Sequence, residues 1–167
     1  MRDCGRSTFV YAVDFVKGEC KMFLDTAFLK SEEIFLQLER AAEEDAVKGW
    51  VPAYHFNICL LDGTPVGKID LRIGHNQKLY YGGNIGYRVE EPYRGHHYAA
   101  KACKLVLDLA RKHDLEYVYI TCNVTNEASA KTCEYAGGTL IATEDLPEDN
   151  DMYKAGTRTV KIFRFEL

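Results

Sequence analysis

The fold of this chain is decided by the stretch IGYRVEEPYRGHHYAA at residues 85–100. Apolar residues alternate with glycine or arginine from Ile85 to Val89, which is typical of a β-strand. Pro92 ends the run because proline lacks the amide hydrogen that a sheet needs. From Tyr98 to His113 the apolar residues recur at helical spacing and form one stripe. The stretch therefore predicts a strand that passes through a short loop into an amphipathic helix.

A second strand follows this helix, so the order strand, helix, strand defines a crossover. Residues 117–122 are apolar, aromatic or β-branched, the pattern of a strand covered on both faces. A crossover of this length joins parallel strands, and ligands in open α/β sheets favour the carboxyl ends of such strands. A further helix is predicted from Glu127 to Ala136 with Asn126 as its N-cap, and two last strands over residues 139–144 and 159–165.

Ahead of the deciding stretch, the pattern predicts a β-hairpin. The runs at residues 55–61 and 66–73 favour strands, and Asp62-Gly63 between them is typical of a hairpin turn. After a polar loop, a third run that we expect to be a strand begins at Tyr80. The sheet is therefore expected to open with adjacent antiparallel strands.

A helix is predicted at residues 31–48, before the hairpin. Apolar side chains recur there at helical spacing, Ser31 is placed as an N-cap, and Glu32 and Glu33 suit the positive end of a helix dipole. Residues 1–50 are accordingly expected to form a helical region on the acceptor side of any active site.

The composition bounds the kind of protein. At 167 residues the chain has the size of one domain, which is predicted over residues 1–167. The formal charge of −4 argues against binding to nucleic acid, and no apolar run is long enough to span a membrane. The six cysteines include no Cys-x-x-Cys pair, so reduced thiols, a cytoplasmic location and no metal site are expected. The oligomeric state is left open, a homodimer included.

The loop between the deciding strand and its helix is a candidate anion site. The first amides of a helix lack partners within the helix, and the dipole makes this end positive. Gly95 permits close approach of the backbone to a ligand, and Arg94 adds a charged contact to phosphate. Lys101 and Lys104 would attract phosphate or are simply solvated. An ordinary strand-to-helix turn has the same pattern, so this loop alone leaves both interpretations open.

The order and spacing of these motifs over residues 80–140 resemble the Gcn5-related N-acetyltransferase (GNAT) superfamily. The likeness rests on Ile85 to Val89, on Arg94-Gly95 opening a helix, on the strand at 119–123, and on Asn126 and Ser129 in the next helix. The amino-acid sequence at residues 82–87 and 120–123 is similar to that of a bacterial subgroup of predicted acetyltransferases. The resemblance implies an α/β fold with a mixed, largely antiparallel sheet, a parallel, splayed strand pair joined by a crossover helix, and helices on both faces.

The resemblance also implies that residues 80–140 form an acetyl-CoA-binding core, with acetyl-CoA between the two parallel strands. Its pantetheine arm would run along Tyr87 and Val89, with Asn126 and Ser129 on the other side; Asn126 is equally a preferred N-cap. The pyrophosphate would bind the loop and the first helical turn, which comprise Arg94, Gly95, His96, His97, Tyr98 and Ala99. The family pattern has glycine at the position of His97, which still donates its amide if its φ is negative.

Two residues are candidates for proton transfer. Many family members place a tyrosine seven residues after the asparagine that opens the second helix, and Cys133 holds that position here, on one helical face with Asn126 and Ser129. Its thiol would protonate the departing thiolate, or it is a small buried side chain and solvent is the donor. Glu90 would relay a proton from the amine, or it is an exposed residue before a proline. A strand amide near Val89 or Glu90 would polarise the thioester carbonyl.

The expected function is that of an acyltransferase that moves an acetyl group from acetyl-CoA directly to a primary amine of a small molecule or peptide. The alternatives are a non-catalytic CoA-binding or sensing module of the same fold, and a nucleotide-phosphate binder that uses only the strand-to-helix site. The amine acceptor is expected to bind residues 1–50 and the late acidic loop at 145–154, where no motif identifies it.

Overall fold

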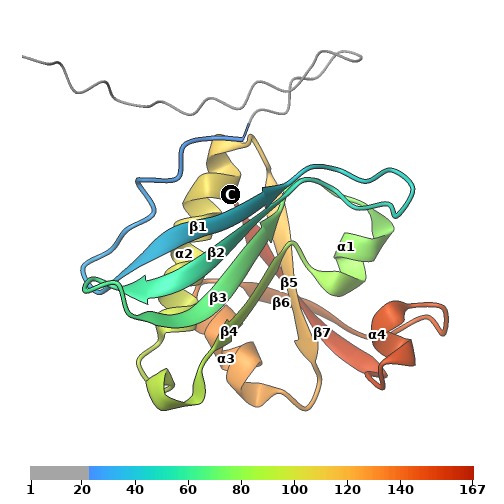
Figure 1. Cartoon of the computed structure of the whole chain (residues 1–167). Coiled ribbons are helices and arrows are strands. Elements are labelled where there is room, and N and C mark those ends of the chain that lie inside the picture. Colours follow the sequence, from blue (N-terminus) through green and yellow to red (C-terminus); the bar gives the residue numbers. More distant parts are fainter. Residues whose placement is uncertain (1–22) are drawn as a thin grey trace, which may run out of the picture.

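The computed structural model describes residues 23–167, in which three successive strands come first and helices and strands then alternate (Figure 1). The part of the expected helical region at residues 1–22 lies outside the described residues. The strands are β1 (Ile34–Ala42), β2 (Ala53–Leu60), β3 (Pro65–Arg72), β4 (Ile85–Val89), β5 (Tyr117–Asn123), β6 (Thr139–Asp145) and β7 (Thr159–Glu166). The helices are α1 (Gln77–Gly82), α2 (Tyr98–Lys112), α3 (Glu127–Tyr135) and α4 (Asp151–Lys154), with a 3-10 turn at Glu91–Tyr93.

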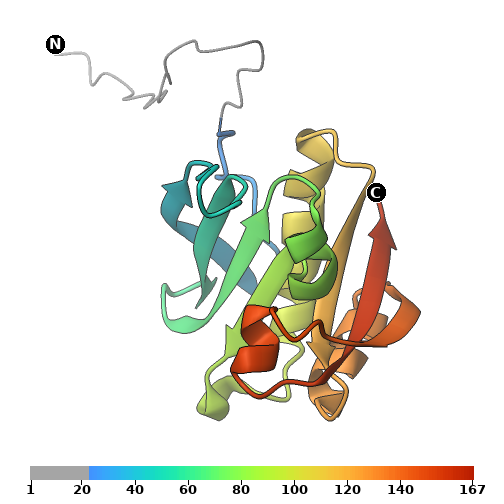
Figure 2. The ribbon, with the colours of Figure 1, turned by 90° about the vertical axis from the view of Figure 1, so that its right-hand side faces the viewer.

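The strands form two antiparallel sheets. One has the order β1-β2-β3-β4 and the other β5-β7-β6, so β4 and β5 are both edge strands. Figure 1 shows β4 and β5 running in the same direction and separating toward their carboxyl ends. Helix α2 connects them and packs against β1, β3 and β4, whereas α3 packs against β5 and β6. In Figure 2, β1–β3 lie on one flank and β6 and β7 on the other, with α2 between them. The predicted α/β fold with a splayed parallel pair is confirmed.

One buried asparagine joins the two edge strands where they begin. Asn84 is the one buried polar side chain among residues 23–167. Its amide donates to the Tyr119 carbonyl at 2.7 Å, and its Oδ1 accepts from the Tyr119 amide at 2.9 Å. Its Nδ2 donates to the Gly74 carbonyl at 2.8 Å. The Asn84 side chain takes one of the two hydrogen bonds to Tyr119 that the backbone would make in a sheet. The backbone hydrogen bonds between β4 and β5 do not continue past Asn84, and the two strands separate beyond it.

The predicted helix at residues 31–48 is wrong, because this segment contains β1. Ile34 and Leu36 are buried at 0% and 5% exposure while Leu38, which a helical stripe would cover, is 42% exposed. Pairing with β2, where Ile34 lies opposite Leu60, outweighs the local helical spacing. Ser31 does cap, since its Oγ accepts from the Ile34 amide at 3.2 Å, but it caps the turn before a strand.

The hairpin prediction is confirmed, but the strand expected from Tyr80 begins only at Ile85. β2 and β3 pair antiparallel around the turn at residues 61–64. Tyr80 lies in helix α1, which starts because the Asn76 side chain accepts from the Leu79 amide at 2.9 Å. Tyrosine favours strands by propensity, but the Asn76 cap favours a helix here, and the helix forms.

Candidate functional site

The free edge of β4 faces the region where the two strands separate. Along its other edge β4 pairs with β3, where the Glu90 amide donates to the Val66 carbonyl at 2.9 Å. Peptide groups of an antiparallel strand point alternately to its two edges, so the amides of Tyr87 and Val89 point away from β3. Of the two amides predicted to polarise a carbonyl, Val89 is therefore free for a ligand and Glu90 is already bonded within the sheet.

The loop after β4 folds back onto the end of the strand. Arg94 Nε donates to the Val89 carbonyl at 3.1 Å, so the guanidinium lies beside the free edge. Gly95 has a φ of +88°, and an added Cβ would have nothing within 4 Å. Glycine is needed there for its left-handed backbone, and open space surrounds it.

His97 also has a left-handed backbone, with a φ of +59°. The condition of a negative φ, under which the His97 amide was expected to donate to the ligand, is therefore not met, and the residue adopts the conformation for which the family pattern uses glycine. Its ring stacks on Tyr135 with the centroids 4.5 Å apart and the planes at 12°. Because a left-handed non-glycine residue costs roughly 1–2 kcal/mol, this stacking compensates for part of the strain.

The start of α2 is left open. No side chain caps it and its first turn contains no acidic residue. The Lys101 amide is the first to bond within the helix, to the His97 carbonyl at 3.0 Å, so the amides of Tyr98, Ala99 and Ala100 precede that ladder. These amides and the positive end of the helix dipole are the donors of a candidate anion site.

The polar and aromatic side chains around this start are already engaged with the protein. Lys101 Nζ donates to the His96 carbonyl at 3.0 Å and pairs with Glu33, which holds it beside the loop. Lys104 Nζ lies 5.3 Å from the centre of the Tyr135 ring. The His96 ring stacks on Tyr98, with the ring centroids 5.3 Å apart. The backbone amides are thus the principal open donors at this end of α2.

Helix α3 brings three of the predicted residues together on one face. The Asn126 side chain accepts from the Ser129 amide at 3.1 Å, as expected of an N-cap. Tyr87 Oη, reaching across from β4, lies 2.9 Å from Ser129 Oγ and 3.6 Å from Cys133 Sγ. The same hydroxyl donates to the Ser129 carbonyl at 3.2 Å. The Tyr87 side chain therefore connects β4 to α3.

Burial changes the acid–base properties of this group. It raises the pKa of the Cys133 thiol to about 12, and the thiol is fully buried at 0% exposure. Burial also raises the pKa of the Tyr87 hydroxyl, and the neighbouring Cys133 adds to that shift. The thiol therefore keeps its proton at neutral pH and is a weaker acid than an ordinary thiol, and the role of Cys133 as a proton donor stays a prediction.

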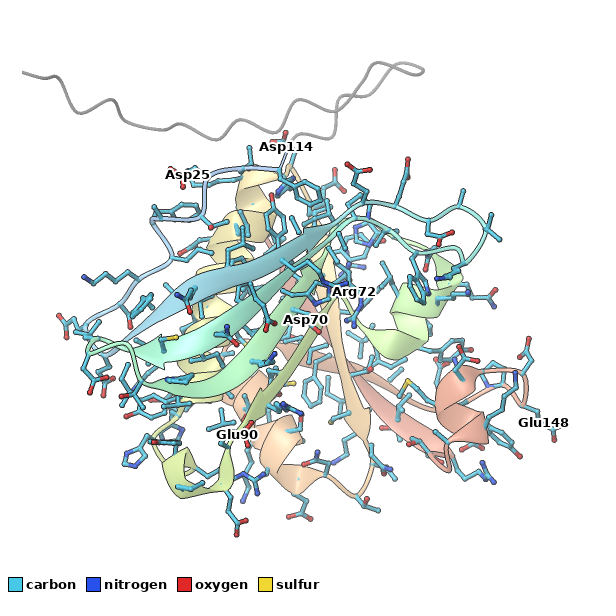
Figure 3. All side chains as sticks on the ribbon, in the orientation of Figure 1. Asp25, Asp70, Arg72, Glu90, Asp114 and Glu148 are labelled. Carbon is cyan, nitrogen blue, oxygen red and sulfur yellow. The ribbon has the colours of Figure 1, made fainter. Side chains whose placement is uncertain are left out.

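Glu90 lies apart from the Tyr87 group. Its carboxylate is 3.6 Å from Arg88 Nε, and both side chains are exposed. Figure 3 shows Glu90 at the lower end of β4, where the loop begins. Its predicted role as a proton relay remains a prediction.

Sequence reasoning missed the bridge at Asn84 and the reach of the Tyr87 side chain to α3. Asn84 stands between Gly83 and Ile85 at the start of a predicted strand, where an amide side chain is unfavourable. That mismatch was the available signal. No pattern along the chain pairs Tyr87 with Ser129, 42 residues later.

No group of three His, Cys, Asp or Glu side chains that would hold a metal ion occurs among residues 23–167. Over the same residues, no helix is both long enough and apolar enough to cross a membrane.

The open start of α2, the left-handed loop before it and the free edge of β4 follow one another along the chain. A diphosphate fits free amides at a helix start, and an arm that carries amide groups fits an unpaired strand edge. Together with the two sheets that part between β4 and β5, these features define an acyl-CoA N-acyltransferase fold. A family model described as an acetyltransferase (GNAT) domain matches residues 20–139. The chain belongs to the GNAT acetyltransferase family.

Solved structures of GNAT enzymes share this fold at low sequence identity. The microcin C7 self-immunity acetyltransferase MccE, in complex with acetyl-CoA and AMP, has a TM-score of 0.55 and 20% identity over 69% of this chain and 61% of its own. The ribosomal L7/L12 α-N-protein acetyltransferase RimL, in complex with coenzyme A, has a TM-score of 0.55 and 20% identity over 72% and 64%. This chain thus spans less than two-thirds of either protein.

A putative ribosomal-protein-serine acetyltransferase from Vibrio cholerae has a TM-score of 0.61 and 14% identity, over 86% of this chain and 100% of its own. Among curated proteins, none matches this chain.

Proposed function

We propose that this chain is an acetyl-CoA-dependent N-acetyltransferase that transfers the acetyl group directly to a primary amine of a small molecule or peptide. The observation that carries the proposal is the open start of α2 beside the free edge of β4. A CoA thioester has a diphosphate, which would bind the open start of α2, followed by an arm with amide groups, which would bind the free edge of β4.

In this proposal the amides of residues 95–99 bind the pyrophosphate, because the Arg94 amide itself donates to the Glu91 carbonyl at 3.3 Å, and the guanidinium of Arg94 adds charge. The peptide group of Tyr87 and the carbonyl of Val89 bind the pantetheine arm. Asn126 uses its oxygen to cap α3, which leaves its amide nitrogen for the other side of the arm. Holding both reactants in place supplies much of the rate, and the Val89 amide stabilises negative charge on the carbonyl oxygen.

The relatives support this function without naming the acceptor. The name of RimL describes acetylation of a protein α-amine, and the structure of MccE contains acetyl-CoA and AMP. Both a peptide and a small molecule therefore stay within the proposal. We also propose that one domain spans the chain and works in the cytoplasm, in line with the free thiols of Cys59, Cys103, Cys122 and Cys133.

The second candidate is a module that binds CoA without catalysis. The observation that favours it is the fully buried Cys133, which stands where many family members have a tyrosine.

Calorimetry and a turnover screen test the proposal. We expect acetyl-CoA to bind and ATP to bind far more weakly, because ATP lacks the pantetheine arm. Release of free CoA is then followed across a panel of amino acids, polyamines, aminoglycosides and peptides with free N-termini. Equal affinity for ATP and acetyl-CoA would indicate a general phosphate site, and binding without release for any amine would favour the non-catalytic module.

A further inference from the structure

Helix α2 packs against one face of the first sheet, and charged side chains lie on the opposite, outer face. Ile69 and Leu71 of β3 are fully buried at 0% exposure on the covered side. Successive side chains of a strand point to opposite faces, so Asp70 and Arg72 lie on the outer face. Figure 3 shows these two side chains next to each other, in front of the strands, with α2 behind.

A row of three residues across neighbouring strands fixes the Asp70 carboxylate. Arg40 of β1 lies opposite His55 of β2, which lies opposite Asp70. Arg40 Nη2 is 3.1 Å from His55 Nε2 and is always a donor, so Nε2 accepts and the proton of the neutral ring is on Nδ1. His55 Nδ1 therefore donates to Asp70 Oδ1 at 2.8 Å. The row holds the carboxylate by one oxygen and leaves Oδ2 for another donor.

Arg72 lies beside that oxygen with most of its donors unused. Its Nη2 is 3.9 Å from Asp70 Oδ2, which is longer than a hydrogen bond, and its Nη1 donates to the Gly83 carbonyl at 3.5 Å. The guanidinium has no other hydrogen bond or ion pair among residues 23–167. The Arg72 and Asp70 side chains are 36% and 31% exposed, so solvent reaches both. The pair therefore offers a carboxylate oxygen next to a guanidinium, which binds carboxylates through two parallel hydrogen bonds.

β4 leaves room for a ligand beside these two charges. Gly86 lies opposite Asp70 in the register, and a Cβ added to it would meet only Arg72 Nη1, at 3.7 Å. Its φ is not positive, so the backbone does not require glycine here. The missing side chain instead opens the surface between Asp70 and the free edge of β4 to a small molecule.

We propose that the amine acceptor is a free diamino acid, whose α-carboxylate binds Arg72 and whose α-ammonium binds Asp70 Oδ2. This inference rests on the proposed function and names its substrate class. A peptide N-terminus has no carboxylate beside its amine, and a polyamine has no carboxylate at all. Neither of them fills both positions over Gly86.

The amine that reacts is the one on the side chain of the acceptor. Asp70 beside the α-ammonium favours its charged form, which has no lone pair with which to attack. Gly86 and Val89 are three residues apart, roughly 10 Å along a strand, and the four-carbon side chain of lysine extends from one toward the other. Its neutral amine attacks the thioester carbon at the Val89 amide. The N–C bond forms, the C–S bond breaks with its electron pair on sulfur, and the proton lost by nitrogen passes through solvent to the CoA thiolate.

Analogues of lysine that each lack one group test this assignment on the full chain. Cadaverine lacks the carboxylate, 6-aminohexanoate lacks the α-amine, and norleucine lacks the side-chain amine. We expect kcat/KM for cadaverine and for 6-aminohexanoate to be ~10–100-fold below that for lysine, because each loses one charge-assisted contact. Mass spectrometry should place the acetyl group on the ε-nitrogen of lysine. Calorimetry in the presence of CoA should show that norleucine binds.

Two variants assign each contact to its residue. Arg72→Gln should bring the lysine-to-cadaverine ratio of kcat/KM close to one and keep the preference for lysine over 6-aminohexanoate. Asp70→Asn should have the reverse effect on the two ratios. Arg72→Gln should also weaken norleucine binding ~10–100-fold. The matched control is Glu39→Gln, which removes a carboxylate paired with Lys68 at 2.9 Å and should change neither ratio.

The outcomes separate this inference from the proposed function. If no amine releases CoA, both fail. If cadaverine or a peptide N-terminus reacts as well as lysine, the function stands and the diamino acid is overturned. Acetylation of the α-nitrogen, or no binding of norleucine, overturns the assignment of the two charges. If both variants slow all amines equally, Asp70 and Arg72 only support the sheet.

Discussion

Helices α2 and α3 follow β4 and β5, the two strands that separate. A side chain caps the N-terminus of α3 (a closed start), whereas no side chain caps the N-terminus of α2 (an open start). At α3, the Asn126 side chain accepts from the Ser129 amide at 3.1 Å, and Glu127 lies in the first turn. At α2, no side chain caps the helix, the first turn has no acid, and Gly95 and His97 approach it with left-handed backbones. The same local feature thus serves folding in one helix and remains available to a ligand in the other.

The difference shows how a helix start becomes an anion site. A side-chain cap and an acidic first turn occupy both the amides and the dipole, which leaves little for a phosphate. An uncapped start gives up about 1 kcal/mol of helix stability and keeps its donors free.

The largest effect is expected from placing a carboxylate at the open start. Gly95→Glu should weaken acetyl-CoA binding at least ~100-fold, about 2.7 kcal/mol, because the side chain occupies and repels the phosphate position. Calorimetry measures the dissociation constant. Gly137→Glu is the control, since Gly137 also has a positive φ, of +99°, and open space around it, but lies after α3. Unchanged affinity in a folded Gly95→Glu protein would mean that the open start is not the phosphate site.

A smaller effect is expected from opening the closed start. Asn126→Ala should lower the free energy of unfolding by about 1 kcal/mol, because the Ser129 amide loses its acceptor. Urea denaturation gives this value. If affinity for acetyl-CoA falls as well, Asn126 also contacts the ligand, as proposed. An unchanged stability would contradict its role as a cap.

At the C-terminal end of α2, His113 contacts Tyr54, and this contact should make the stability of the protein depend on pH. Tyr54 Oη lies 2.7 Å from His113 Nε2, and burial lowers the pKa of His113. The folded state therefore prefers neutral histidine, so its stabilisation is complete above the unfolded pKa of ~6.5 and declines as pH falls below it. The effect is modest, because His113 is only partly buried. Thermal unfolding between pH 7.5 and 5 should show a steeper loss for the wild type than for His113→Gln. If the wild type and His113→Gln lose the same stability as the pH falls, His113 is not the cause of the pH dependence.

The smallest effect is expected at His97. His97→Gly relieves the left-handed strain but removes the stacking on Tyr135, and the two changes are each of order 1 kcal/mol, so stability should stay within about 0.5 kcal/mol. Acetyl-CoA affinity should be preserved, since only the backbone of the loop is needed. A loss of affinity that is largest at low pH and shrinks as the pH rises through the histidine range would instead show that a protonated ring binds phosphate.

The sequence predicted the second half of the fold more accurately than the first. β4, α2, β5 and α3 have the predicted order because their apolar patterns agree with their final packing, as in α2, where Cys103, Val106 and Leu109 are all at 0% exposure. In β1 the local pattern and the tertiary pairing disagree, and pairing with β2 prevails. Among the candidate site residues, Gly95 and Asn126 were identifiable because each has a distinct role in the local backbone: Gly95 has a positive φ and Asn126 caps a helix.

By itself, the sequence determined the crossover from β4 through α2 to β5, the loop at Arg94 and Gly95, and the cap at Asn126. These depend on interactions between residues a few positions apart, which local patterns record. Only the tertiary structure decided that Asn84 joins two sheets, that His97 adopts a left-handed backbone against Tyr135, and that the Tyr87 hydroxyl covers Cys133. Those contacts join residues 35 to 46 positions apart, and they form only when the packing of whole elements brings them together.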